Sequence, residues 1–396
     1  MRDPVTLSTG ITFDRDNIER WIFSGKHNTC PVTKQTLPEL DLTPNHTLRR
    51  LIQAWCTANA SKGVERFPTP RQPVNKAQIS KLLDVIISTQ DQLPSLLKLK
   101  SIVLESERNK QYVQASGAVD ILVSVIKNYI IEEESGSDHN EEESESSSNA
   151  SDEALCILYS LQLSEQDLVD LISKNGEFVE SLTAMLRRSN YQSRAYAALL
   201  LRSILAVIPP VRLVALKEEL FEEMVKVIKD KISYQALKAG LRTLAWLCPW
   251  GRNRIKAVEA GAVNVLIELL LDEPEKMACE MVLLVLDLMC GCAEGRAEMM
   301  SHAAGIAVVM RMMLRVSAVA TNRSVRILHS LSKFSASPAI IHEMMAVGAV
   351  SKLCFVLQVN CGIKTKEKVQ EILRLHSMAW KHSPCLSPQF QASYPS

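Results

Sequence analysis

Four side chains near the start of the chain could bind a metal or act as nucleophiles, namely His27, Cys30, His46 and Cys56. A zinc site that braces a small domain needs about eight Cys and His ligands arranged in C-x-x-C pairs. This part of the sequence has no such pair, so we predict that it binds no metal and needs no cofactor. Cys30 precedes a proline and lacks a paired histidine and carboxylate, so we do not expect it to form covalent intermediates.

The residues around these side chains predict a hairpin followed by a short helix. Apolar residues alternate on both sides of a turn at Gly10, which is typical of a β-hairpin. Asp14 or Asp16 could cap the helix, because a short acidic side chain accepts hydrogen bonds from the first helical N–H groups. The apolar stripe of this helix consists of Ile18, Trp21 and Ile22. Gly25 would end the helix.

A second helix is predicted to begin at Asn45, directly after Pro44. The apolar residues on one of its faces are Leu48, Leu51, Ile52 and Trp55. We expect this face to pack against Val5 and Ile18. Truncation of a buried aromatic side chain costs about 3 to 5 kcal/mol, and we expect that loss for Trp55→Ala.

The stretch from Asp3 to Trp55 also resembles a known family. The motifs D-P-V, T-G-I-T-F-D-R, I-E-x-W, C-P-V-T, L-x-P-N and L-x-x-L-I-x-x-W follow one another as in the U-box of ubiquitin ligases. The resemblance implies a small α+β module over residues 1–58, similar to a RING domain but without zinc. In that family, hydrogen bonds and ion pairs replace the metal. The residues that would make them here are Thr9, Asp14, Arg15 and Asn45. Asp14 and Arg15 could also cap a helix, and the two roles are compatible.

The U-box resemblance further implies where a partner binds. A U-box carries no covalent ubiquitin but holds a conjugating enzyme that is already charged with it, so catalysis is by positioning. The residues that would contact this enzyme are Trp21, Ile22, Cys30, Pro31, Val32 and Lys34. Pro31 and Val32 would form an apolar loop, and Lys34 could donate a hydrogen bond toward ubiquitin or the enzyme. Trp21 could equally be a core residue.

One departure from the family concerns the segment before the D-P-V motif. A U-box normally begins with a further segment that contains a C-P-I-like loop. Met1 lies two residues before Asp3, so we expect this first loop to be absent. The sequence would then come from a truncated gene model or from a protein with a disabled module. Since the first loop would supply an apolar anchor facing Pro31, we expect weak or no self-ubiquitination.

The composition restricts the class of protein. The chain has 396 residues, enough for two domains or a repeat array, and its net charge of +1 gives no field to attract nucleic acid. Aromatic residues make up only 5%, which favours packed helices over a sandwich or barrel. We find no apolar run long enough to span a membrane. The ten cysteines are scattered and suit reduced thiols, so we expect a cytoplasmic protein, with the nucleus as a further location.

Beyond a polar linker at 59–75, one signature recurs, a glycine followed by an apolar helix. It occurs at Gly117, Gly176, Gly261, Gly305 and Gly348, and the last three are spaced by 44 and 43 residues. This period predicts a stacked helical solenoid over 76–382. The details resemble armadillo repeats, which form a right-handed solenoid, and we expect about six units. We expect the glycine to lead into the longer third helix of each unit, because a side chain would block a steep helix crossing.

An acidic insertion interrupts the first repeats at 132–153. It has ten acidic residues, seven serines and no lysine or arginine, so we predict a disordered loop. It could be a solvated spacer, or a phosphorylatable segment that binds basic partners or a basic face of the chain itself. The tail at 383–396 is also predicted to be disordered.

Together the two regions resemble plant U-box and armadillo-repeat ubiquitin ligases, which mostly mark proteins for degradation in stress and immune signalling. The resemblance implies that the U-box recruits a ubiquitin-charged conjugating enzyme. The armadillo groove would bind a protein substrate, whose lysines receive ubiquitin. The alternative is a catalytically inactive armadillo adaptor that has lost part of its U-box. We discount an import receptor, because Trp246, Trp250 and Trp380 lack the Trp-x-x-x-Asn ladder of those proteins.

Overall fold

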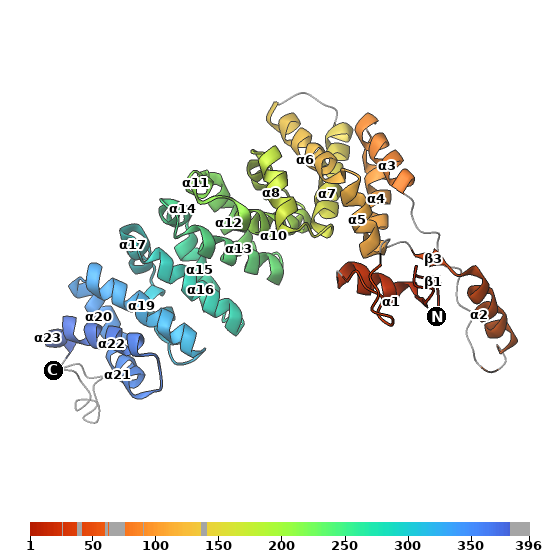
Figure 1. Cartoon of the computed structure of the whole chain (residues 1–396). Coiled ribbons are helices and arrows are strands. Elements are labelled where there is room, and N and C mark those ends of the chain that lie inside the picture. The colour runs from red at the N-terminus through yellow and green to blue at the C-terminus, as the bar shows by residue number, and fades with distance from the viewer. Residues whose placement is uncertain are drawn as a thin grey trace. The chain divides into compact units, whose positions relative to one another are not determined.

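The computed structural model describes residues 1–25, 27–37, 42–59, 62, 76–89, 91–135 and 141–380. They belong to two compact units, Met1–Leu163 and Ser164–Ser396, which we treat in turn (Figure 1). Of the predicted linker at 59–75, only Asn59 and Lys62 are among the described residues. The predicted tail at 383–396 lies outside them.

The chain begins with a small antiparallel sheet. Its strands are β1 (Pro4–Thr6), β2 (Thr12–Asp14) and β3 (Thr43–Pro44), in the order β2-β1-β3. Val5 lies opposite Phe13 on one side and Pro44 on the other. The predicted hairpin around Gly10 is confirmed. The third strand was not predicted, because two residues are too few to show an alternating pattern.

The first helix follows the hairpin directly. It consists of α1 (Arg15–Glu19) and a π-helical turn, η1 (Arg20–Ser24), and it ends at Gly25 as predicted. Gly25 has a φ of −78°, so it does not end the helix through a left-handed conformation. Ile18 and Ile22 point into the core of the module, while Trp21 is half-buried at its edge.

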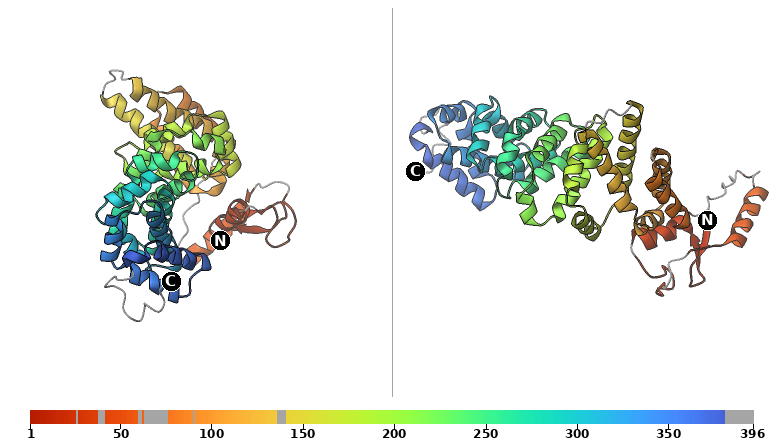
Figure 2. Two further views of the ribbon diagram at one scale, coloured as in Figure 1. Left: turned by 90° about the vertical axis from the view of Figure 1, so that its left-hand side faces the viewer. Right: turned by 90° about the horizontal axis from the view of Figure 1, so that it is seen from above.

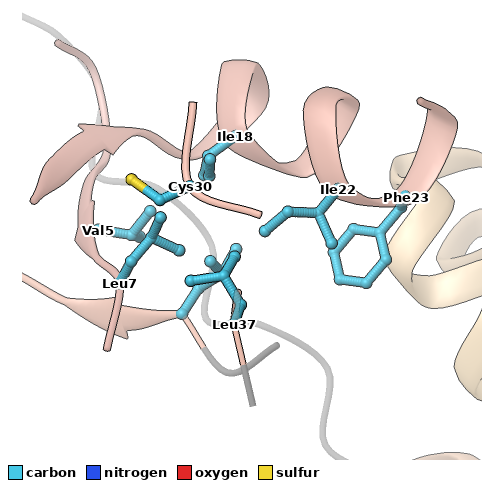
Figure 3. Close-up of a cluster of buried hydrophobic side chains, with 8 residues drawn as sticks. Val5, Leu7, Ile18, Ile22, Phe23, Cys30 and Leu37 are labelled. Atoms are coloured by element: carbon cyan, nitrogen blue, oxygen red, sulfur yellow. The ribbon is translucent and has the colours of Figure 1, made fainter. Parts of the chain in front are cut away.

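The core of this module is small. Figure 3 draws its eight buried side chains and labels seven of them, which come from β1 and the residue after it, the first helix and the segment that follows this helix. The buried residues are Val5, Leu7, Ile18, Ile22, Phe23, Cys30, Leu37 and Leu42, with Ile11, Phe13 and Trp21 packed against them. A core of this size leaves the module only marginally stable through apolar burial, so polar contacts must contribute as well.

The second helix, α2 (His46–Ala58), begins as predicted but turns a different face inward. Leu51 is 62% exposed and Trp55 is 60% exposed, so the prediction that they pack on Val5 and Ile18 is wrong. The inward positions are instead the half-buried Leu48 and Ile52 and the buried Cys56, each one turn apart. The cap residue Asn45 is bonded to the sheet, and this bond fixes the rotation of the helix.

The rest of the first unit consists of helices. They are α3 (Lys76–Ser88), α4 (Leu93–Glu105), α5 (Glu107–Ala115), α6 (Ala118–Ser135) and α7 (Glu141–Ser160). The prediction of a loop over all of 132–153 is therefore wrong, because α6 and α7 extend into the insertion from both sides. Ala150 and Ser151 are buried, and Glu153 forms an ion pair with Lys100 at 2.8 Å, so the end of the insertion belongs to the solenoid. Residues 136–140 lie outside the described residues.

The second unit repeats a three-helix motif. Its helices are α8 (Glu165–Lys174), α9 (Phe178–Met185), α10 (Tyr191–Val207), α11 (Pro210–Val214), α12 (Glu218–Asp230), α13 (Tyr234–Leu247), α14 (Asn253–Glu259), α15 (Ala262–Leu271), α16 (Lys276–Met289), α17 (Ala293–Ser301), α18 (Gly305–Met312), α19 (Ala318–Phe334), α20 (Pro338–Ala346), α21 (Ala349–Gln358), α22 (Ile363–Leu375) and α23 (Ser377–Trp380). With α5 to α7 of the first unit, the helices from α8 to α22 make six units of three, which agrees with the predicted number.

The recurring glycines precede a different helix from the one predicted, and glycine is required there for a different reason. Gly261 and Gly348 lead into the second helix of their units, which has ten residues, and not into the longer third helix. Their φ values are +79° and +73°, and an added Cβ at either would meet nothing within 4 Å. The left-handed backbone, not a close helix crossing, therefore requires glycine at these positions. Two of the five glycines differ. An added Cβ at Gly305 would lie 2.1 Å from the Met299 carbonyl oxygen, whereas Gly176 has neither a positive φ nor an atom within 4 Å of an added Cβ.

The third helices of consecutive repeats pack side by side in the second unit, from α10 through α13, α16 and α19 to α22 (Figures 1 and 2). The second helices are linked by cations that donate to carbonyl oxygens of the repeat before. Arg311 donates to Leu270 at 2.9 Å, and Lys352 donates to Met310 at 2.5 Å. Positive side chains are favourable near the carbonyl end of a helix, so each contact stabilises the stacking of neighbours.

Within the described part of the chain, no single helix is both long and apolar enough to cross a membrane, although the bent pair α20 and α21 together meets that criterion by length and composition. The nine cysteines of this part are free thiols.

Candidate functional site

The motif C-P-V-T-K forms a closed loop at the end of the first helix. The Cys30 N–H donates to the Gln35 carbonyl at 2.9 Å, and the Lys34 N–H donates back to the Cys30 carbonyl at 3.0 Å. Lys34 has a φ of +60°, a backbone conformation that residues other than glycine rarely adopt. Because the loop is held at its base, its tip points outward, and Val32 is 63% exposed.

Trp21 supports this loop from the helix. Its indole N–H donates to the Thr29 carbonyl at 2.8 Å, and the ring of His27 stacks on it at 4.0 Å. The Lys34 ammonium lies 5.6 Å from the centre of the indole ring. Trp21 thus positions the loop through its indole N–H and its ring, and it keeps Lys34 beside the apolar tip.

Two of the six predicted contact residues cannot reach a partner. Ile22 and Cys30 are buried in the core of the module, which corrects the expectation that they bind the conjugating enzyme directly. They are buried because the helix turns Ile22 inward and the loop base turns Cys30 toward β1 (Figure 3). The accessible members are Val32 and Lys34, with Pro31 and Trp21 half-buried behind them.

The sulfur of Cys30 is an acceptor of hydrogen bonds inside the loop. Thr9 donates to it at 3.6 Å, and the Thr33 N–H donates to it at 3.5 Å. Burial by itself raises the pKa of the Cys30 thiol, but the hydrogen bonds from Thr33, Thr9 and Val32 together lower this pKa to about 7. The hydrogen bond from Thr9 therefore connects the hairpin turn to the loop through the Cys30 side chain, which solvent does not reach.

A polar cluster fastens the N-terminus to the first helix. Asp14 occupies the cap position without making a side-chain cap, and its carboxylate instead accepts from the Arg2 and Asp3 N–H groups at 3.1 and 3.0 Å. Arg15 donates to the Asp3 carboxylate at 2.5 Å and lies 3.5 Å from the Glu19 carboxylate. Burial raises the pKa of Glu19, and Arg15 opposes that shift.

Asn45 joins the sheet to the second helix. Its amide donates to the hydroxyls of Thr6 and Thr12 at 3.3 Å each, and these two hydroxyls are themselves 2.9 Å apart. Its carbonyl oxygen accepts from the Leu48 N–H at 3.0 Å and caps α2. Asn45 and the Asp14 cluster therefore connect three segments without a metal ion. The described residues contain no group of three or more His, Cys, Asp or Glu that could hold one.

The structural roles of His27, Thr6 and Thr12 were not predicted from the sequence, although the two threonines left a signal. Thr6 and Thr12 lie on paired strands at positions directly opposite each other, as the hairpin register requires. The asparagine that caps the next helix could therefore have been predicted to form hydrogen bonds with these two threonines. The stacking of His27 on Trp21 left no signal, because it depends on the path of the chain after Gly25.

This combination, a small module with an outward apolar loop followed by three-helix repeats, defines a U-box joined to an armadillo solenoid. The family model described as "U-box domain" matches residues 1–61, and the one described as "Plant U-box protein ARM repeat region" matches residues 77–395.

Among curated proteins, the chain is similar to two ligases of Arabidopsis thaliana. It is 50% identical to E3 ubiquitin-protein ligase PUB23, over 100% of this chain and 94% of that one. It is 46% identical to E3 ubiquitin-protein ligase PUB22, over 100% and 95%. Among solved structures, a chain from work on cadherin and beta-catenin covers 85% of this chain and 58% of its own length, with a TM-score of 0.60 at 13% identity. That likeness concerns the fold alone.

The chain therefore belongs to the plant U-box and armadillo-repeat family of ubiquitin-protein ligases. Its activity is the transfer of ubiquitin, and its partners are a ubiquitin-conjugating enzyme, ubiquitin and a protein substrate.

Proposed function

We propose that the loop tip from Pro31 to Lys34 receives the conjugating enzyme and that the third helices of the second unit hold the substrate. The observation that carries the proposal is the exposure of Val32 at the end of a loop that is closed by backbone hydrogen bonds. An apolar side chain held rigidly in solvent suits a small protein interface, because little entropy is lost when a partner covers it.

Lys34 would act beside this apolar contact. Its ammonium lies against Trp21 and can donate to a carbonyl or carboxylate on the enzyme or on ubiquitin. Such a bond would hold the thioester of the charged enzyme in one orientation, which speeds attack by a substrate lysine without any covalent step on the ligase. Cys30 takes no part in the chemistry, since its sulfur is enclosed in the core.

The setting of this activity is also a proposal. The resemblance to plant U-box and armadillo proteins supports action in the cytoplasm, on proteins whose removal regulates stress and immune signalling.

The test uses the full chain and compares two alanine variants, one at Val32 and one at Ile87, whose side chains are similarly exposed. Val32→Ala should weaken binding of a purified conjugating enzyme by roughly 30-fold, since a central apolar contact is worth about 2 kcal/mol. The matched control is Ile87→Ala on α3, whose side chain is 66% exposed outside the U-box, and it should leave the affinity unchanged. Equal affinities for the wild type and Val32→Ala would remove the loop from the interface.

A further inference from the structure

Two arginines lie together on neighbouring third helices of the second unit. Arg202 is on α10 and Arg242 is on α13, one repeat apart, and these helices pack against each other. The Nε atom of Arg202 is buried and has no hydrogen-bond partner. Burial lowers the pKa of Arg202, and the positive charge of Arg242 on the adjoining helix lowers it further.

Other arginines on third helices of the second unit form ion pairs with acidic residues. Arg194 on α10 donates to Asp230 at 2.6 Å, and Arg323 and Arg326 on α19 both contact Asp287, at 2.9 and 2.6 Å. Neither Arg202 nor Arg242 forms an ion pair with any residue that the structure describes. A pair of like charges without a counter-charge is a cost to folding, and such costs persist mainly where a ligand removes them.

A tryptophan completes the surface around this pair. The indole N–H of Trp246 donates to the Leu205 carbonyl at 3.0 Å, which connects α13 to α10. Leu205 follows Arg202 by about one helical turn, and Trp246 follows Arg242 by one turn, so this bond sets the two arginine turns side by side. Trp246 remains 41% exposed, one turn beyond Arg242 on the same helix. Lys238, one turn before Arg242, adds a third cation to the same helix.

We propose that Arg202, Arg242 and Trp246 form a receptor for an acidic segment of the protein substrate. This inference rests on the proposed substrate role of the third helices and adds the chemistry of the segment that they select. Guanidinium groups bind carboxylates and phosphates through paired N–H donors, and partial burial strengthens these bonds. Two neighbouring carboxylates, or one phosphate, would satisfy both arginines, while the indole would cover an adjacent apolar side chain.

The test uses the full chain and three fluorescent peptides of one sequence. One peptide has Asp-Glu pairs beside a leucine, the second has a phosphoserine in place of one pair, and the third has Asn and Gln in place of every acid. Fluorescence anisotropy should detect binding of the acidic or the phosphorylated peptide but not of the neutral one, and binding should weaken as salt is raised. Preference between the first two peptides distinguishes carboxylate from phosphate.

The matched variants separate this receptor from general charge. Arg202→Gln with Arg242→Gln should weaken binding of the preferred peptide by at least tenfold. The control is the single variant Arg326→Gln, on a third helix where Asp287 already pairs with the arginine, and it should change the affinity less than twofold. The melting temperature of the double variant should be unchanged or raised, because a repulsion is removed, whereas a structural role would lower it.

Two results would overturn the inference. The neutral peptide could bind as tightly as the acidic one, or the double variant could retain full affinity for the acidic peptide. Either result leaves the U-box assignment intact if Val32→Ala still weakens binding of the conjugating enzyme. If Val32→Ala has no effect, the proposed function fails whatever the peptides show.

Discussion

The U-box module and the second unit are stabilised in different ways. The core cluster of the module has eight buried apolar residues, and the module relies on polar links between distant segments, such as Asn45 to Thr6 and Arg15 to Asp3. In the second unit, apolar side chains are buried in every repeat, and the polar bonds link each repeat to the one before. In the module each contact occurs once, whereas a solenoid distributes its stability over similar neighbours. Sensitivity to mutation should therefore be concentrated at the end of the chain that binds the enzyme.

The largest difference is expected from a matched pair of core truncations. Ile18→Ala in the module and Ile267→Ala in α15 both remove a fully buried side chain, at a cost of about 2 to 5 kcal/mol. The first should unfold the module and abolish binding of the conjugating enzyme while leaving the main melting transition in place. The second should lower that transition and leave enzyme binding intact. Calorimetry and a binding assay on both variants check this, and equal behaviour would contradict the contrast.

A smaller loss is expected from the ion pairs of the module. Arg15→Gln leaves the Asp3 and Glu19 carboxylates without their cation in a partly buried position, which should cost about 2 kcal/mol. Arg20→Gln serves as the control, since this arginine is exposed and should change stability by less than about 0.5 kcal/mol. Urea unfolding of both variants and the wild type, followed by the loss of conjugating-enzyme binding, measures both. If the two substitutions cost the same, the polar cluster does not stabilise the module.

A cross-repeat contact of the solenoid should have a weak effect that depends on pH. Hydrogen bonds from Lys333 and His329, each at 2.7 Å, lower the pKa of Glu371 to about 2. Because this pKa is lowered from the ordinary 4.5, the contact stabilises fully above pH 4.5 and is lost as pH falls toward 2. Glu371→Gln should therefore be less stable than the wild type at pH 6, and the difference should shrink at pH 3. A stability difference that grows on acidification would contradict the stabilising role of ionised Glu371.

The smallest effect is expected for Trp55→Ala. The sequence predicted a buried tryptophan, but the side chain is mostly exposed and belongs to no core cluster. Its truncation should change the free energy of unfolding by no more than about 0.5 kcal/mol. A loss of 3 kcal/mol or more in chemical denaturation would restore the packing that the apolar pattern of the helix suggested.

What the sequence predicted correctly depends on short-range signals. The turn at Gly10, the cap at Asn45 and the period of the repeats are all encoded within a few residues or by repetition. The prediction of the inward face of α2 was wrong because Leu48, Leu51, Ile52 and Trp55 are compatible with more than one apolar stripe. Hydrogen bonds from Asn45 to strands that lie more than thirty residues earlier determine which stripe faces inward.

The candidate site was predicted only in part for a similar reason. The motif located the loop, and Val32 and Lys34 lie at its tip. The burial of Ile22 and Cys30 could not be seen from the motif, because it depends on how the helix and the loop base meet β1. The unpaired arginines on α10 and α13 were missed, since their closeness depends on the stacking of two repeats and leaves no local pattern.

In the proposed mechanism, the U-box loop positions the charged enzyme and the solenoid takes no part in the chemistry. The measurement that tests it most directly is single-turnover discharge of ubiquitin from a charged conjugating enzyme onto free lysine, with the full chain present. Val32→Arg should reduce the acceleration by at least tenfold, because it places a charge in an apolar contact, while Arg202→Gln with Arg242→Gln should discharge at the wild-type rate. Discharge at the wild-type rate by Val32→Arg, or its loss in the double arginine variant, would contradict the account.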